Sequence, residues 1–197
     1  GAQHGISCPQ VLSAGELHDE RRRRYLQQRN GCRDADCSVR AEKRGTHMTD
    51  GEKIAKAAAA WLGTPHINGA KVKGRGVDCG MLLIGCVEDA GLLKKDSVQI
   101  EPYSNEWHLH HSEEWFLSYV QKYCDEVETM QPGDFLLYQF GRCISHGAVY
   151  VGKGRVIHAY IDRGVVMTDL SDVMFFDAKG RSRLRGIYRF NKKKVRR

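Results

Sequence analysis

The sequence predicts an α+β domain in which helices come first and an antiparallel sheet follows. Apolar residues recur at helical spacing between residues 50 and 127. After the turn "QPGD" at 131–134, the pattern changes to short apolar runs separated by Gly or Asp, as expected for strands. No internal repeat is visible, and this order of helices and then strands is typical of the α+β class.

Three helical regions are predicted ahead of the turn. Asp50 can cap a helix through "GEKIAKAAAAWLG", which is rich in the best helix former and is stopped by Gly63 and Pro65. The glycine-rich loop "INGAKVKGRG" comes next, and a second helix with apolar residues at helical spacing then ends at Gly91. Residues 105–127 form the third region, with three aromatic side chains on one face, namely Trp115, Tyr119 and Tyr123.

Five strands are predicted after the turn. Each is an apolar run bounded by Gly or Asp, and together the runs predict a meandering antiparallel sheet. In chain order the predicted strands are "FLLYQF", "SHGAVYVG", "RVIHAY", "GVVMTDL" and "LRGIYRF".

The domain is expected to span residues 48–197, with residues 1–47 as an N-terminal appendage. The segment "ELHDERRRRYLQQRN" is polar and only weakly amphipathic. The string "GTHM" at 45–48 has the character of a cloning junction, unless Met48 is a natural start. No candidate site residue falls in residues 1–47, so we expect a chain that starts at Met48 to fold and to keep its chemistry.

The net charge of +7 lies at the ends of the chain. Residues 1–47 carry nine Lys or Arg against six acids, residues 48–180 carry 13 against 18, and residues 181–197 carry nine and no acid. The basic end, "NKKKVRR", is expected to be a solvated tail. No nucleic-acid motif accompanies it, so specific nucleic-acid binding is not predicted. No apolar run is long enough to span a bilayer, so no transmembrane segment is predicted.

The seven cysteines are odd in number and show no repeated CxxC spacing, which argues against a structural zinc site. Cys32 and Cys37 are close enough to pair if the protein meets an oxidising compartment. Cys86 and Cys124 fall on helical patterns, where cysteine behaves as a small core residue.

Cys79 stands apart because it lies where a glycine-rich loop enters a helix, in "GVDCGMLLIGC". The N–H groups and the dipole at a helix start favour thiolate over thiol. With a base beside it, we expect the pKa of Cys79 to lie below about 7.5, against roughly 8.5 for a free thiol. A lone cysteine at a helix start is more often structural, so a base must also be found.

Two histidines on predicted strands supply that base. His146 and His158 flank the turn "GKG", and pairing of the strands around it predicts that the two face each other. One imidazole can then accept the thiol proton while the second orients the first. Either histidine alone would be unremarkable, but the combination with Cys79 predicts nucleophilic catalysis.

Residues 52–190 resemble the NlpC/P60 family of papain-like cysteine peptidases, in particular the small cell-wall hydrolases encoded among phage tail genes. The matching pieces are "AAAAWLGTPHINGA", "GVDCGMLLIGCVEDAGLL", "MQPGDFLLYQF", "SHGAVYVGKGRVIHAY" and "LRGIYRF". The resemblance implies a papain-like fold with Cys79 as nucleophile, His146 as general base and His158 as orienting residue. It implies hydrolysis of an amide in peptidoglycan stem peptides, commonly next to D-glutamate and a diamino acid. Attack by a thiolate, with an imidazole to move the proton and backbone donors for the oxyanion, is expected to need no cofactor and no metal.

The resemblance also bears on location and partners. The first residues, "GAQHGISCPQVLSAG", lack the apolar stretch of a secretory signal. We therefore expect synthesis in the cytoplasm and action at the cell wall after delivery by another carrier, such as a phage particle, with phage tail proteins as further partners.

Two departures from the family pattern concern the substrate side. His66 replaces the usual tyrosine after Thr-Pro and is a candidate oxyanion donor, while "DCGM" replaces the usual Asp-Cys-Ser-Gly. Asp78, ahead of the nucleophile, is expected either to hold the loop or to meet a substrate amine. The histidines of "HLHH", at 108, 110 and 111, are expected on the surface or beside the substrate groove and not as metal ligands.

Two alternatives remain open. The chain could keep the fold as a tail or assembly module with weak or no catalysis, although the intact Cys79, His146 and His158 argue against this. It could also act as an amidase or acyltransferase on another amide or ester. The order of Cys before His disfavours relatives with the reverse order, and His158 stands where CHAP amidases usually have Asn or an acid.

Overall fold

The computed structural model describes residues 47–103 and 114–195. Contacts group Met48–Arg197 into one compact unit. The predictions for residues 1–46, including the pairing of Cys32 with Cys37, lie outside the described residues and stay predictions.

Two of the predicted helices are present. Helix α2 (Asp50–Ala59) begins after Thr49, which is the N-cap and forms a reciprocal capping box with Glu52. The expectation that Asp50 caps this helix is therefore wrong by one residue. Asp50 lies in the first turn, where its negative charge still favours the helix dipole. Helix α3 (Cys79–Asp89) ends just before Gly91, as predicted, and Gly91 has the positive φ of 70° that glycine tolerates.

The third helical region is shorter than predicted. Helix α5 covers Trp115–Tyr123, and the chain then enters strand β3 (Cys124–Glu126). Cys124 pairs with Phe190, so hydrogen bonds from a strand distant in sequence override the local helical pattern. The assignment of Cys124 to a helix is therefore wrong, although its side chain is buried as expected. Residues 105–113 of the predicted region lie outside the described part.

The glycine-rich loop also contains structure that the sequence did not indicate. It forms a two-stranded hairpin from β1 (Lys71–Val72) and β2 (Gly76–Val77). Because Val77 immediately precedes the Asp78–Cys79 pair, this hairpin fixes the path of the chain into α3.

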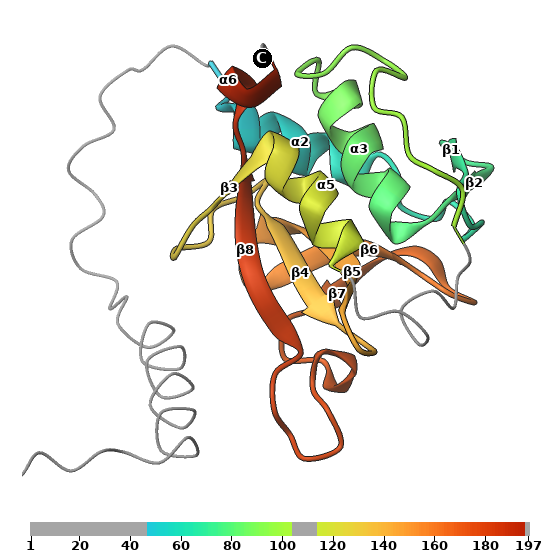
Figure 1. Cartoon of the computed structure of the whole chain (residues 1–197), viewed down its shortest axis with the longest axis vertical. Coiled ribbons are helices and arrows are strands. Elements are labelled where there is room, and N and C mark those ends of the chain that lie inside the picture. The colour runs from blue at the N-terminus through green and yellow to red at the C-terminus, as the bar shows by residue number, and fades with distance from the viewer. Residues whose placement is uncertain (1–46, 104–113, 196–197) are drawn as a thin grey trace, which may run out of the picture. The chain divides into compact units, whose positions relative to one another are not determined.

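Six strands build the main sheet, in the order β3-β8-β4-β5-β6-β7 (Figure 1). The neighbours β4 to β7 form the predicted meander, but β8 returns to lie between β3 and β4, so the sheet is not a simple meander. The helices α2 and α3 pack on β5, and α5 contacts β5 and β8. The bounds of the strands after β3 are β4 (Phe135–Gln139), β5 (Ile144–Gly152), β6 (Arg155–Tyr160), β7 (Gly164–Asp169) and β8 (Leu184–Phe190).

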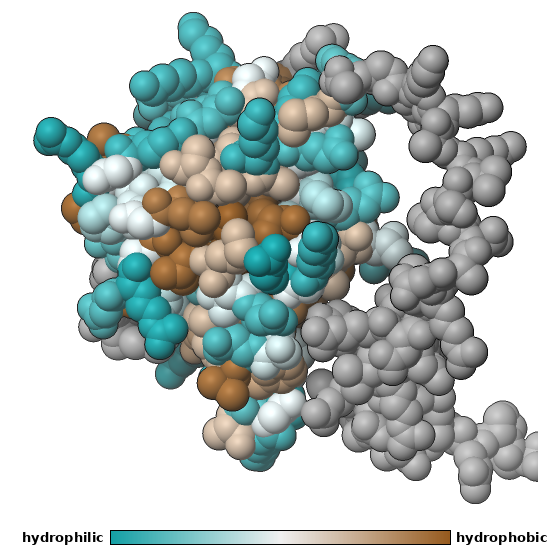
Figure 2. Space-filling model, turned by 180° about the vertical axis from the view of Figure 1, so that it is seen from behind, coloured by the Kyte–Doolittle hydropathy of each residue, from teal (hydrophilic) through white to brown (hydrophobic). Residues whose placement is uncertain are grey.

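Two clusters of buried side chains stabilise the domain. The larger joins α2, α3 and α5 to the sheet and includes Trp61, Leu83 and Val149. The second is built around Tyr138 and Phe175, with the 3-10 helix η1 (Val173–Phe175) contributing to it. On the face shown in Figure 2, hydrophobic side chains gather in a central patch, and smaller hydrophobic areas lie among the hydrophilic ones around it. Most large apolar side chains of the described residues are buried in these clusters, and a few, such as Val72 and Val173, are exposed.

Part of the basic end of the chain forms a short helix that contacts the domain. Lys192–Val195 forms the short helix α6, in which Lys194 binds Asp125 at 2.8 Å and Lys192 binds Asp50 at 2.8 Å. None of these residues is buried, and residues 196 and 197 lie outside the described part, so the solvated tail stays a prediction. Within the described residues, no helix combines the length and apolar character needed to cross a membrane.

Candidate active site

Asp78 fixes the start of the helix that carries Cys79. It is the N-cap of α3 and is only 3% exposed. Its Oδ1 accepts a hydrogen bond from the Met81 N–H at 2.8 Å, and its Oδ2 accepts from the Gly69 N–H and the Tyr103 hydroxyl, both at 2.6 Å. Both oxygens are engaged, so the structure supports the loop-holding role over contact with a substrate amine.

Loss of this cap should be costly. We expect Asp78→Ala to lower the free energy of unfolding by about 3 kcal/mol, because the variant loses a helix cap and leaves buried donors without their acceptor. Thr49→Ala is the matched control: it removes the exposed cap of α2 and should cost only about 1 kcal/mol. Urea unfolding measures both, and equal losses would contradict this role of Asp78.

The thiol of Cys79 lies against the backbone of β5. It donates a hydrogen bond to the Ser145 carbonyl at 3.7 Å, and the backbone N–H of Gly147 also bonds to the sulfur. Cys79 therefore contacts the residues on either side of His146. Among the described contacts, the thiol hydrogen bond goes to this carbonyl and not to the imidazole ring.

The electrostatic setting of Cys79 contradicts the expected low pKa. Cys79 is partly buried. Desolvation of its thiol, and next the Asp78 carboxylate, raise the pKa of the thiol to about 12, against the smaller lowering effect of N–H groups from Gly147, Gly80 and Cys79 itself. The expected value below about 7.5 is therefore wrong. The helix start does offer its N–H groups, but desolvation and a neighbouring negative charge outweigh them.

Alkylation of the resting protein tests this correction. Because only the thiolate reacts, we expect the rate of Cys79 modification by iodoacetamide to keep rising beyond pH 9. Peptide mapping separates Cys79 from the other described cysteines, which are buried. A rate that levels off below pH 8 would show an activated thiolate instead.

His146 and His158 are brought together as predicted, but by a different register. Val149 pairs with Ile157 and Tyr150 with Val156, which shifts β6 by two residues from the expected pairing. The histidines are therefore diagonal neighbours and not directly opposite each other. Because the shift is even, they keep the same sheet face, and His146 Nε2 lies 3.0 Å from His158 Nδ1.

Both rings are shielded from water. His146 is 7% exposed and His158 is 0% exposed, and they pack against Phe140 and Phe175 at ring distances of 5.2 and 5.6 Å. Burial, then the charges of His158 and His66, lower the pKa of His146 well below 6.5. Burial likewise lowers the pKa of His158 to about 4. Both imidazoles are neutral at pH 7, as a general base requires.

His66 lies next to the strand that leads into Cys79. It forms a bridge with Val77, and the flanking hydrogen bonds run from Ile67 N–H to the Val77 carbonyl at 3.2 Å and from Val77 N–H to Pro65 at 3.0 Å. The effect of His66 on the pKa of His146 places it near that ring. The structure thus positions His66 at the candidate site.

Two further residues contact the candidate site without a signal in the sequence. Thr168 Oγ1 lies 2.9 Å from His158 Nε2, and Tyr103 reaches Asp78 from 25 residues away. The histidines at 108, 110 and 111 lie outside the described residues. Within residues 47–103 and 114–195, no group of three His, Cys, Asp or Glu side chains could hold a metal ion.

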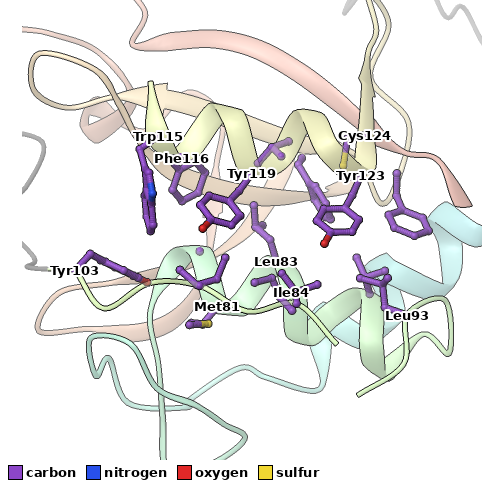
Figure 3. Close-up of a pocket in the computed structure, with 17 residues that line it drawn as sticks. Met81, Leu83, Ile84, Leu93, Tyr103, Trp115, Phe116, Tyr119, Tyr123 and Cys124 are labelled. Carbon is purple, nitrogen blue, oxygen red and sulfur yellow. The ribbon is translucent and has the colours of Figure 1, made fainter. Parts of the chain in front are cut away.

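An apolar pocket adjoins the first turn of α3 (Figure 3). It lies between α3 and α5, is partly open to solvent, and includes Gly80 and Met81 in its wall. The predicted aromatic face of α5 is confirmed here: Trp115, Tyr119 and Tyr123 all line the pocket. Its lining is almost entirely apolar, so an apolar group of a ligand could lie beside the candidate nucleophile.

Solved structures resemble the fold at low sequence identity. NlpC1 from Trichomonas vaginalis matches with a TM-score of 0.50 and 18% identity, covering 76% of this chain and 46% of that protein. The NlpC/p60 domain of the peptidoglycan hydrolase SagA matches at 0.46 and 20%, covering 71% and 98%. RipD of Mycobacterium tuberculosis, a non-catalytic NlpC/p60 domain protein adapted to peptidoglycan binding, matches at 0.43 and 14%, covering 73% and 98%.

The first of these structures shows the fold, and the chain spans less than half of that protein's length. No curated protein matches the chain in sequence. The NlpC/P60 family model matches residues 63–189, which include Cys79, His146 and His158. The family generally contains peptidoglycan hydrolases and cysteine peptidases, with some non-catalytic members. The chain belongs to the NlpC/P60 family.

Proposed function

We propose that the protein is a cysteine peptidase that hydrolyses an amide bond in peptidoglycan stem peptides. The observation that carries the proposal is the buried pair of His146 and His158, joined at 3.0 Å, on strands beside the helix that begins at Cys79. Family membership supplies the substrate class. A purely structural domain has no need for two neutral histidines buried beside a cysteine at a helix start.

The proposed reaction starts from a neutral pair. As the Cys79 sulfur attacks the scissile carbonyl, its proton passes to Nδ1 of His146, because Nε2 is engaged with His158. The oxyanion receives hydrogen bonds from the N–H of Cys79 and from the side chain of His66. His146 then protonates the leaving amine, and water hydrolyses the thioester to release the acid and restore the thiol.

This neutral pair predicts a distinctive pH profile. Activity requires unprotonated His146, whose pKa lies well below 6.5, so kcat/KM should fall only as the pH drops below 6.5. The thiol stays protonated until its pKa of about 12, so no fall is expected between pH 7 and 10. A preformed thiolate–imidazolium pair would instead lose activity as the pH rises and the imidazolium deprotonates. Initial rates from pH 4 to 10 distinguish the two.

Digestion of muropeptides tests the function itself. Purified full-length protein is incubated with muropeptides of defined stem sequence, and the products are identified by mass spectrometry. We expect two fragments whose masses sum to the substrate plus one water, which also identifies the cleaved bond. EDTA should leave this activity intact, and iodoacetamide should abolish it. Intact muropeptides that bind the protein without cleavage would favour the interaction module.

We propose that the enzyme acts at the cell wall after delivery, with a phage tail as the carrier. Support for this comes from the motifs that resemble hydrolases encoded among phage tail genes. Co-purification of the protein with assembled tails tests this, and recovery of all the protein in the tail-free fraction would argue against it.

A second candidate is an amidase or acyltransferase that acts on an apolar acyl group. The apolar pocket at Gly80 and Met81 favours it, because an acyl chain could lie there with its carbonyl near Cys79. N-acyl anilides of increasing chain length, compared with stem peptides, separate the two substrates. A kcat/KM that rises with chain length and exceeds that for stem peptides would favour this candidate.

A further inference from the structure

Thr168 extends the histidine pair by one more side chain. Its Oγ1 lies 2.9 Å from Nε2 of His158, whose Nδ1 lies 3.0 Å from Nε2 of His146. Val166 pairs with His158 and Val156 pairs with Thr168, so Thr168 and His158 are diagonal neighbours on one face of β6 and β7. The hydrogen-bonded groups thus run without a break across β7, β6 and β5.

The hydrogens that link His146, His158 and Thr168 can be arranged in two ways, because each neutral histidine has one donor and one acceptor nitrogen. In the first, His146 donates from Nε2 to His158, and His158 donates from Nε2 to Thr168. In the second, Thr168 donates to His158, His158 donates to His146, and His146 carries its hydrogen on Nδ1. Only the first arrangement leaves Nδ1 of His146 able to accept a proton.

We propose that Thr168 is a positioning residue whose hydroxyl accepts the His158 hydrogen bond and so holds His146 in the tautomer that can deprotonate Cys79. The proposal rests on the proposed function, because it assigns a role within that same site.

Burial explains why removal of this hydroxyl should force the second arrangement. His158 is fully buried, and a buried N–H without an acceptor is rarer and more costly than an unfilled lone pair. Without the Thr168 hydroxyl, His158 would keep its hydrogen on Nδ1, where His146 can accept it. With the His158 hydrogen on Nδ1, His146 must carry its own hydrogen on Nδ1. Nδ1 of His146 can then no longer accept the proton of Cys79.

Two charged groups act on the pKa of His158, and neither belongs to the strands that carry His158 and Thr168. Asp172 raises the pKa of His158 and Arg163 lowers it, and both lie outside β6 and β7. During the reaction, the proton from Cys79 moves to Nδ1 of His146, and the resulting imidazolium still donates from Nε2 to His158. Thr168 gains no proton at any step.

Kinetics give the first test. We expect Thr168→Val, which keeps the shape and removes the hydroxyl, to lower kcat on a muropeptide about 10- to 100-fold with KM unchanged. Thr168→Ser restores the acceptor and should act like the wild type. Thr129→Val, on an exposed residue away from the sheet pair, is the matched control. Wild-type kcat in Thr168→Val would overturn the proposal.

Nitrogen-15 NMR of the histidine rings gives a second test that does not depend on turnover. In the full-length wild type, both His146 and His158 should carry hydrogen on Nε2, and in Thr168→Val both should carry it on Nδ1. Unchanged tautomers in Thr168→Val, or Nδ1–H on His146 in the wild type, would overturn the proposal. A wild type that cleaves no muropeptide would refute the proposed function, while the tautomer switch would still decide the part assigned to Thr168.

Discussion

We expect Cys79→Ala to lower kcat/KM for muropeptide hydrolysis by at least about 10⁴-fold, because loss of a nucleophile removes the covalent route altogether. Alanine keeps the start of α3, since the cap comes from Asp78 and not from the thiol. The free energy of unfolding should therefore change little. Initial rates with a defined muropeptide, together with urea unfolding, measure the two effects separately.

Cys86→Ala is the control for this substitution. Cys86 is fully buried on the same helix, in the larger core cluster, so its replacement should cost stability without changing the chemistry. If both variants lost activity in proportion to their loss of stability, the effect of Cys79→Ala would be structural. If Cys79→Ala kept full activity, the assignment of the nucleophile would be wrong.

The next largest effect is expected at His146. His146→Ala should lower kcat/KM about 10³- to 10⁴-fold, because the thiol, with its raised pKa, then has no base to accept its proton. Because the Cys79 thiol is protonated, its attack depends on a base more strongly than the attack of a cysteine that is already a thiolate. His47→Ala, at an exposed histidine, should match the wild type.

His158 should matter less than His146 because it acts through the other ring. We expect His158→Ala to keep more activity than His146→Ala, with both proteins folded by circular dichroism. The reverse order would mean that His158 is the base, which its hydrogen bonds to His146 and Thr168 do not favour. Full activity in either variant would show that the pair does not serve the reaction.

Much of the site could be predicted because its signals are local. The loop before Cys79, the apolar spacing of α3 and Gly91 at its end all lie within a few turns of chain. The period of two in β5 and β6 was likewise enough to place His146 and His158 on one face. The observed strand pairing differs from the predicted one by two residues. Because this number is even, both histidines stay on the predicted face of the sheet and still lie close together.

What could not be predicted depends on contacts between distant segments. Pairing with β8 turns Cys124 from a helical residue into a strand residue. Tyr103 reaches Asp78 across 25 residues, and Thr168 meets His158 only because β7 pairs with β6. The prediction of a low pKa for Cys79 was wrong for the same reason. The sequence shows that Cys79 starts a helix, but desolvation of its thiol depends on how the domain folds around it.

Nucleophilic catalysis by Cys79 requires an acyl-enzyme on its sulfur, and this intermediate can be sought directly. Full-length protein is quenched in acid during turnover of a muropeptide and mapped by peptide mass spectrometry. We expect a thioester on Cys79 whose added mass equals the acyl part of the substrate, and no such adduct in Cys79→Ala. Formation of the cleavage products at the wild-type rate by Cys79→Ala, with no adduct on the wild type, would contradict it.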